Sequence, residues 1–326
     1  MIKIGLLGVG HLGNIHLRLI RELPEFQLVG FFDPDSEKAA TIQQDTGIPA
    51  FESMEALLER VDAVDIVTPT LTHFACAKAA IEAGKHVFIE KPLTHTLEEG
   101  RKLLDLFAAH PDLLFQVGHV ERFNPAFLAV EDRKLSPMFI EGHRLAMYNP
   151  RGTDVSVVLD LMIHDLDVVL SLVPAPVKEV HASGVHVVSN SPDIANARIE
   201  FENGCVANLT ASRISMKNMR RLRLFQQNTY LAVDFLKKSA EVFRLSDEKV
   251  GPASFEFDTG TETKYLVFEQ PEVTENNAIK QELEEFAHAI QGKRAVRVPL
   301  QDGFRALEVA HLILEKIDEG HRLAQV

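Results

Sequence analysis

The sequence predicts an α/β protein in which a doubly wound parallel sheet is followed by an α+β domain with a mostly antiparallel, open-faced sheet. Up to about residue 118, short apolar runs alternate with helical segments, which is typical of parallel βαβ units. Beyond residue 120, one helical segment is followed by several strand-like runs, and 326 residues are enough for two cores. We therefore expect a first domain at residues 1–120 and a second at 121–326, with the C-terminal helices packing back toward the first.

A glycine-rich turn stands at the start of the chain. An apolar run at residues 2–7 leads into Gly8-Val9-Gly10-His11-Leu12-Gly13, and a helix to Leu23, a second strand at 26–32 and Asp33 follow. Gly8 permits the tight turn, Gly10 lets the backbone approach a pyrophosphate, and Gly13 lets the helix lie close to the strand. A glycine turn without a ligand is the alternative. The surrounding strand, helix and acid favour a Rossmann dinucleotide-binding domain.

Asp33 indicates which dinucleotide is bound. Its carboxylate can accept hydrogen bonds from the adenosine ribose and would repel a 2′-phosphate. Pro34 and Asp35 follow, without an arginine nearby to bind such a phosphate. NAD is therefore the expected cofactor, and NADP is less favoured.

The rest of the first domain supplies further strand ends. We expect helices at 36–46, capped by Ser36 and ended by Gly47, and at 54–60, 72–83 and 96–110, the last begun by a capping box of Thr96 and Glu99. Strands at 64–67, 86–89 and 114–117 end at one edge of the sheet, where ligands bind. The expected cofactor-binding residues are Gly8, Gly10, His11, Leu12, Gly13, Asp33, Thr68, Pro69, Thr70, His73, Glu90 and Lys91.

The second domain reads as one helix among strands. Strand-like runs are at 139–148, 177–188, 194–201, 205–214, 221–226 and 230–235, a helix is at 154–172, and two amphipathic helices close the chain. Glu202-Asn203-Gly204 is typical of a hairpin turn. So few helices leave one face of the sheet uncovered, which predicts a homodimer or homotetramer formed through that sheet.

Composition excludes several classes of function. A net charge of −13 argues against nucleic acid as a partner, because phosphate neutralisation needs clustered lysine and arginine. Cys76 and Cys205 are far apart and offer neither a disulfide framework nor a cysteine-rich zinc site, which suggests a reducing cytoplasm. No apolar stretch is long enough to cross a bilayer, so no membrane partner is expected.

Four ionisable groups are candidates for chemistry. Lys91 stands at a strand end before Pro92, which restricts it to extended angles and makes the bond a candidate for cis; a surface lysine is the alternative. On the helix at 154–172, Asp160, His164 and Asp167 follow one another at spacings of four and three, so they share a face. A buried histidine satisfied by two carboxylates is one alternative. A metal site is another, but no second group of ligands completes its shell, and we expect no metal.

Together these groups fit the oxidation of a secondary alcohol. His164, held by a carboxylate, would act as the general base while hydride passes to the nicotinamide. Lys91 would stabilise the developing oxyanion, and Asp160 would orient the substrate or His164.

These motifs resemble the Gfo/Idh/MocA oxidoreductase family over essentially the full length. The likeness rests on the glycine turn, on Thr68-Pro69-Thr70 with His73, on residues 84–93 with Glu90-Lys91-Pro92, and on residues 160–167. It implies a sugar or cyclitol dehydrogenase with catalytic roles for Lys91, Asp160 and His164, and a second domain that often mediates dimers or tetramers.

Residues 118–125 resemble the branch that acts on nucleotide-linked amino sugars, such as UDP-N-acetylglucosamine 3-dehydrogenases. This likeness implies that Arg122 and Asn124 join Lys91, Asp160 and His164 in binding substrate, although Arg122 could equally be a structural ion-pair partner. The family's glycine-rich entry to the catalytic helix is replaced by residues 153–158, Thr-Asp-Val-Ser-Val-Val. Two other functions share this fold: a non-catalytic regulator that senses NAD, and a glycosidase that uses NAD transiently.

Overall fold

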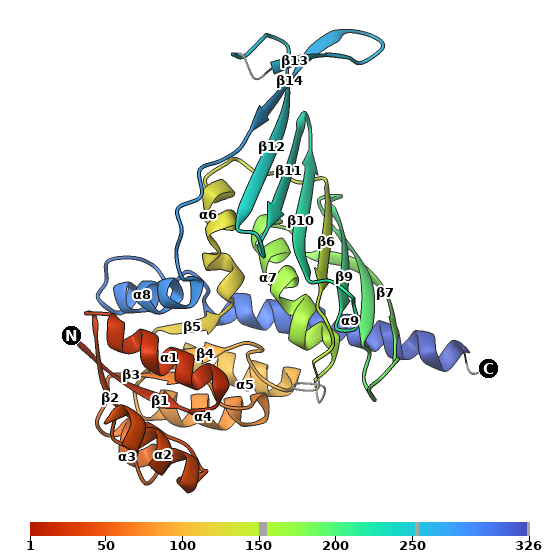
Figure 1. Ribbon diagram of the computed structural model, residues 1–326. Coiled ribbons are helices and arrows are strands. Elements are labelled where there is room, and N and C mark those ends of the chain that lie inside the picture. Colours follow the sequence, from red (N-terminus) through yellow and green to blue (C-terminus); the bar gives the residue numbers. More distant parts are fainter. Residues whose placement is uncertain (150–154, 252–253, 325–326) are drawn as a thin grey trace. The chain divides into compact units, whose positions relative to one another are not determined.

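The computed structural model describes residues 1–149, 155–251 and 254–324, and it divides into two compact units (Figure 1). Unit 1 comprises Met1–Phe123 and Asn277–Glu308. Unit 2 comprises Asn124–Asn276 and the residues from Val309 onward. Each unit has its own sheet.

The sheet of unit 1 is parallel and has the strand order β2-β1-β3-β4-β5. Its strands are β1 (Ile2–Leu7), β2 (Phe26–Phe32), β3 (Ala63–Ile66), β4 (His86–Glu90) and β5 (Phe115–Gly118). The chain adds β2 on one side of β1 and β3 on the other, so the order reverses between β1 and β3. Ligands of doubly wound sheets bind outside the carboxyl ends of the strands at this point.

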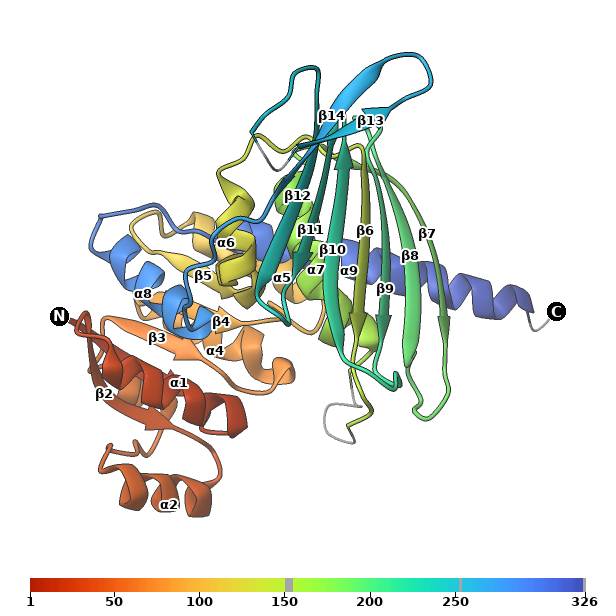
Figure 2. The same cartoon turned by 45° about the horizontal axis from the view of Figure 1, so that its top comes forward.

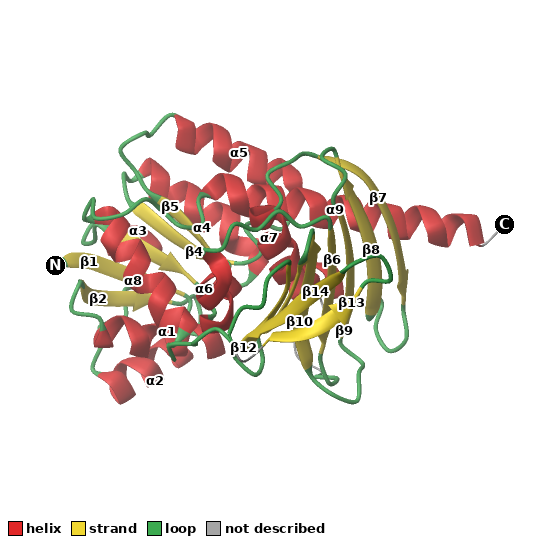
Figure 3. Cartoon of the chain, turned by 90° about the horizontal axis from the view of Figure 1, so that it is seen from above, coloured by secondary structure: helices red, strands yellow, loops and turns green. Residues whose placement is uncertain are grey.

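Helices cover both faces of this sheet (Figure 3). They are α1 (His11–Glu22), α2 (Ser36–Thr46), α3 (Met54–Leu58), α4 (Thr70–Glu82), α5 (Leu97–Ala108) and α8 (Ala278–Ile290). On one face, α1 and α8 bury Ile20 and Phe286 against Ile4 and Phe88 of the strands. Helices α3, α4 and α5 contact one another in sequence on the other face. The predicted Rossmann arrangement is confirmed.

Local sequence signals explain most helix ends. The Thr96–Glu99 capping box is present, and Gly47 ends α2 with a φ of 71°. The expected cap of α2 was wrong by one residue, because Asp35 rather than Ser36 accepts the hydrogen bond from the Lys38 amide. Aspartate and serine are equally good caps, so the sequence alone did not show which of these two neighbouring residues precedes the helix.

Unit 2 is built on a nine-stranded sheet with the order β13-β14-β12-β11-β10-β6-β9-β8-β7. Its strands are β6 (Phe139–Leu145), β7 (Val177–Val185), β8 (Ile194–Phe201), β9 (Val206–Ser212), β10 (Met219–Gln226), β11 (Thr229–Asp234), β12 (Ser239–Ser246), β13 (Ser254–Asp258) and β14 (Thr263–Glu269). The pair β6–β9 is parallel and the other neighbours are antiparallel, which confirms the mostly antiparallel sheet. The predicted hairpin turn joins β8 to β9, with Gly204 at a φ of 83°.

The helices of unit 2 lie against one face of its sheet (Figure 2). They are α6 (Pro125–Glu131), a π-helical turn at Val158–Met162, α7 (Ile163–Leu172) and the later part of α9 (Leu300–Ala324). A buried ion pair fixes α7 to β6, because Arg144 donates to both carboxylate oxygens of Asp165 at 3.1 and 2.7 Å. In the part of the chain that the structure describes, no helix is long and apolar enough to span a membrane.

The expected single α-helix at 154–172 was partly wrong. Residue 154 lies outside the described residues, 155 and 156 are not helical, and residues 158–162 form the π-helical turn. A π-turn inserts an extra residue into the helix, so a spacing of four no longer places Asp160 and His164 as it would in an α-helix. Such turns are frequent at functional sites.

Candidate active site

The glycine turn of unit 1 is built by close backbone approaches. Gly8 has a φ of 92°, and a Cβ there would lie 2.8 Å from the Val67 carbonyl oxygen. A Cβ on Gly13 would lie 2.1 Å from the Gly8 carbonyl oxygen, so only glycine lets α1 start this close to β1. Gly10 has open space where its side chain would be. It begins α1 without a side-chain cap, so the first amides of the helix, at His11 and Leu12, are available to an anion.

Asp33 lies at the end of β2 with its carboxylate held in place. Its oxygens accept the backbone N–H groups of Val9 and Asp35, each at 3.0 Å, and Lys38 donates to both at 3.0 and 3.2 Å. Burial raises the pKa of Asp33, but these hydrogen bonds and the Lys38 charge outweigh burial and lower it overall. The sequence reasoning considered arginine near Asp33 and missed Lys38, which stands in the first turn of α2.

The loops after β3 and β4 are joined by His73. Thr68 and Pro69 lead into α4, which begins at Thr70. The buried ring of His73 contacts the Pro92 carbonyl oxygen through Nδ1 and the Thr68 carbonyl oxygen through Nε2, both at 2.9 Å. Burial lowers the pKa of His73. Both ring nitrogens therefore contact the protein, and His73 joins the two loops.

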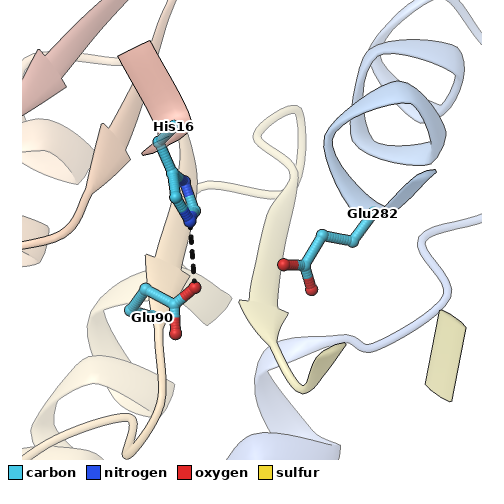
Figure 4. Close-up of side chains that lie close together, drawn as sticks. All are labelled: His16, Glu90 and Glu282. Carbon is cyan, nitrogen blue, oxygen red and sulfur yellow. Dashed lines mark ion pairs between the residues drawn. The ribbon is translucent and has the colours of Figure 1, made fainter. Parts of the chain in front are cut away.

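Lys91 follows β4 and is half-buried, and the Lys91–Pro92 peptide is cis. The side chain of Glu90 turns into the protein, where Oε2 accepts the Lys91 backbone N–H at 3.2 Å and Oε1 lies 3.3 Å from Nε2 of His16 (Figure 4). Gly118 on β5 leaves the space for this carboxylate, since a Cβ there would lie 3.1 Å from Oε1. Glu90 therefore supports the strand end that carries Lys91.

His119, which the sequence reasoning passed over, is buried just after β5. Burial and the positive charges of Arg122 and Lys91 lower the pKa of its imidazole to about 3. The ring is therefore neutral at physiological pH. A histidine beside a glycine at a strand end was the available signal.

Arg122 and Asn124 have structural partners. Arg122 donates to the Arg297 carbonyl oxygen at 3.4 Å and lies 3.5 Å from the Asp302 carboxylate. Asn124 caps α6, because its Oδ1 accepts a hydrogen bond from the Ala126 amide. Its Nδ2 donates to the Phe235 carbonyl oxygen at 3.1 Å. Each side chain thus has contacts within its own unit, and a role in substrate binding stays a prediction.

The remaining predicted residues lie on the helix of unit 2. Asp160 is in the π-helical turn, and both it and His164 are half-buried. Asp167 and Asp165 are buried, and Asp165 forms the ion pair with Arg144. The structure thus places Lys91 in unit 1 and Asp160 and His164 in unit 2.

Both units match one family of enzymes. Residues 2–119 match the oxidoreductase family's NAD-binding Rossmann fold, and residues 148–325 match its C-terminal alpha/beta domain. The chain belongs to the Gfo/Idh/MocA family. It is therefore an oxidoreductase with an NAD-binding Rossmann domain, as the sequence resemblance implied.

Several relatives have named activities. The chain is 38% identical over 310 residues to UDP-N-acetylglucosamine 3-dehydrogenase of Acidithiobacillus ferrooxidans, covering 95% of each protein. A solved structure of that enzyme covers 98% of each chain with a TM-score of 0.88. The NAD(+)-dependent scyllo-inositol 2-dehydrogenase of Bacillus subtilis is 32% identical over 66% of this chain and 68% of its own. All of these relatives are dehydrogenases, and this chain is an enzyme of the same class.

Proposed function

We propose that this protein is an NAD-dependent dehydrogenase that interconverts a secondary hydroxyl and a ketone on a nucleotide-linked amino sugar of the UDP-N-acetylglucosamine kind. The supporting observation is the likeness to the UDP-N-acetylglucosamine 3-dehydrogenase, which extends over both units at 38% identity. An inositol is the second candidate substrate, because the Bacillus subtilis relative acts on one.

The cofactor and each proposed site residue have separate roles in this reaction. The bound cofactor supplies the acceptor for hydride. His164 removes the hydroxyl proton as the general base, and Asp160 orients the sugar or the imidazole. The Lys91 ammonium stabilises the oxyanion that develops as the proton leaves. The free amides after Gly10 bind the pyrophosphate at the start of α1.

Activity should appear with NAD and UDP-N-acetylglucosamine, measured as absorbance of the reduced cofactor against a panel of free sugars and inositols.

His164→Ala should lower kcat by roughly 10²–10⁴-fold through loss of the base. Lys91→Ala should lower it by about 10²–10³-fold through loss of charge stabilisation. Lys78→Ala and His181→Ala, at exposed positions on α4 and β7, are the matched controls and should leave kcat unchanged.

Two results would count against this proposal. Reduction of NAD by none of the panel would favour a non-catalytic regulator that senses the cofactor. Full turnover in His164→Ala would remove the imidazole from the role of base. Activity with an inositol alone would move the substrate to the second candidate and keep the reaction.

We infer that Asp33 makes NAD the preferred cofactor and that Lys38 moderates this preference. A 2′-phosphate beside the Asp33 carboxylate would be repelled, whereas Lys38, 3.0 Å from that carboxylate, would attract it. Asp33→Asn should lower the ratio of kcat/KM for NAD over NADP by roughly tenfold, and Lys38→Ala should raise it. The ratio, measured at constant ionic strength, tests both. An unchanged ratio in Asp33→Asn would show that another group sets the preference.

We also infer that the open face of the nine-stranded sheet is covered by a second copy of the chain. Charged pairs join strands of that face: Arg223 of β10 is bonded to Glu141 of the neighbouring β6, and Arg221 of β10 lies 3.6 Å from Glu241 of β12, across β11. Light scattering should give a mass of two or four times 36.4 kDa, and Arg223→Glu should lower it. A wild-type mass of 36.4 kDa at micromolar concentration would contradict this.

A further inference from the structure

Four ionisable side chains meet inside unit 1, close to the strand end that carries Lys91. His16 of α1, Asp65 of β3 and Glu282 of α8 are 0% exposed, and Glu90 of β4 is 7% exposed. The His16 ring bridges two carboxylates, with Nδ1 at 2.8 Å from Asp65 and Nε2 at 3.3 Å from Glu90. Burying several ionisable groups together is costly unless the charged ones are paired or some of them are neutral.

Glu282 differs from the other three. Among the described residues, neither of its carboxyl oxygens has a hydrogen-bond partner. Figure 4 shows the carboxyl directed toward Glu90 and His16, and one polar atom from each of these three side chains lies within 4.8 Å of the other two. A fully buried carboxyl is thus aimed at a second carboxylate and at an imidazole already placed between two acids.

One added proton would halve the net negative charge of this group. With His16 charged and all three acids ionised, the group would carry two net negative charges in a site that excludes water. An ionised carboxylate without partners is costly in such a site and takes up a proton instead. Glu282 is the acid without partners, so the proton belongs on it, while the His16 cation stays between the Asp65 and Glu90 anions.

The pKa shifts of Glu282, His16 and Glu90 agree with this assignment. Burial also raises the pKa of Asp65, and its contact with His16 offsets that only in part. Burial and then the charge of Glu90 raise the pKa of Glu282 well above its ordinary value. Burial lowers the pKa of His16, but Asp65 and Glu90 outweigh it and raise the value overall. Burial raises the pKa of Glu90, and the interactions with His16 outweigh it and lower the value.

We propose that Glu282 is a neutral acid that holds a proton and, together with His16, acts as a positioning residue for Glu90 and hence for Lys91. Glu90 accepts the Lys91 backbone N–H at 3.2 Å, so the position of its carboxylate fixes the start of the turn that presents the lysine. A neutral Glu282 leaves the Glu90 carboxylate undisturbed, whereas an ionised one would repel it. The role of Glu282 in catalysis rests on the proposed function; its protonation does not.

Several groups face Glu282 from the elements packed around it. They are His16 on α1, Asp65 on β3, Glu90 at the end of β4, and Gln116 on β5, whose Nε2 donates to the Glu282 backbone carbonyl at 2.8 Å. The charge of Lys91 acts on Glu90. His119, after β5, is neutral and adds no charge.

These shifts set the sign of the pH dependence. The folded pKa values of Glu282 and His16 lie above their ordinary values of 4.5 and 6.5, so the folded state binds more protons between each ordinary value and the raised one. The stability that both groups contribute is full below those ordinary values and is lost as pH rises through the folded ones. The free energy of unfolding should therefore fall on the alkaline side.

Infrared spectroscopy of the full-length protein tests the protonation directly. At neutral pH the wild type should show the carbonyl stretch of a neutral carboxylic acid, and Glu282→Gln should abolish that band. Glu285→Gln is the matched control on the same helix. Glu285 is 8% exposed but is paired with Arg294, so its replacement should leave the band in place.

Chemical denaturation gives a second readout that is independent of activity. Glu282→Gln keeps the shape and a donor, so its free energy of unfolding at neutral pH should equal or exceed that of the wild type and fall less as pH rises. A band that survives in Glu282→Gln would overturn the proposal. A stoichiometric divalent metal that is present in the purified wild type and lost in Glu282→Gln would also overturn it, because Glu282 would then be an ionised ligand.

Kinetics test the positioning role once a substrate is found. Glu282→Ala should lower kcat by roughly ten- to a hundredfold with little change in KM for NAD, because the lysine is displaced while the glycine turn is not. Glu282→Gln should restore most of kcat and move the alkaline limb of the pH profile to higher pH. Equal losses in both variants, with an unmoved limb, would reduce Glu282 to a packing residue.

Discussion

Unit 1 depends on the His16 imidazole lying between two buried carboxylates. One neighbour, Asp65, is on the central strand β3, and the other, Glu90, is at the end of β4. His16 itself stands on α1, three residues after the last glycine of the turn. One charged contact therefore ties the helix that follows the glycine turn to the strand that precedes Lys91. Breaking a buried ion pair by removing one partner typically costs about 3–5 kcal/mol, so these elements keep their register.

Unit 2 uses the same principle in a different way. The buried pair of Arg144 and Asp165 fixes α7 to β6, and the π-helical turn precedes it. Asp165 is thereby committed to structure, while Asp160 and His164 are half-buried. A rigid helix with an irregular first turn can hold a base and its orienting acid at fixed positions. Under the proposed function, this helix carries the residues that act on the sugar.

The elements predicted correctly are those marked by local sequence signals. Strand β2 and helix α2 were placed with their observed bounds, and the capping box at Thr96 was found, because apolar periodicity and caps are local signals. Strands β12, β13 and β14 were missed; β13 is exposed at four of its five positions, so it shows no alternation between buried and exposed residues. The π-helical turn was missed because the apolar periodicity of a helical segment does not show where an extra residue is inserted.

The candidate site was predicted in outline and not in its supporting contacts. The glycines, Asp33 and Lys91 follow from motifs, whereas Lys38 is recognisable only from its ion pair with Asp33. The buried group around His16 joins residues far apart in the chain, so spacing could not reveal it. Its one signal was Asp65, an acid within an otherwise apolar strand.

We propose that Lys91 of unit 1 and His164 of unit 2 act on the same hydroxyl group of the substrate. A crystal structure of the complex with NAD and UDP-N-acetylglucosamine tests it most directly. The account predicts that Nζ of Lys91 and one ring nitrogen of His164 both lie within hydrogen-bonding distance of the sugar hydroxyl whose carbon faces the nicotinamide ring. Finding the two groups in separate cavities, or the imidazole turned away from the sugar, would contradict it.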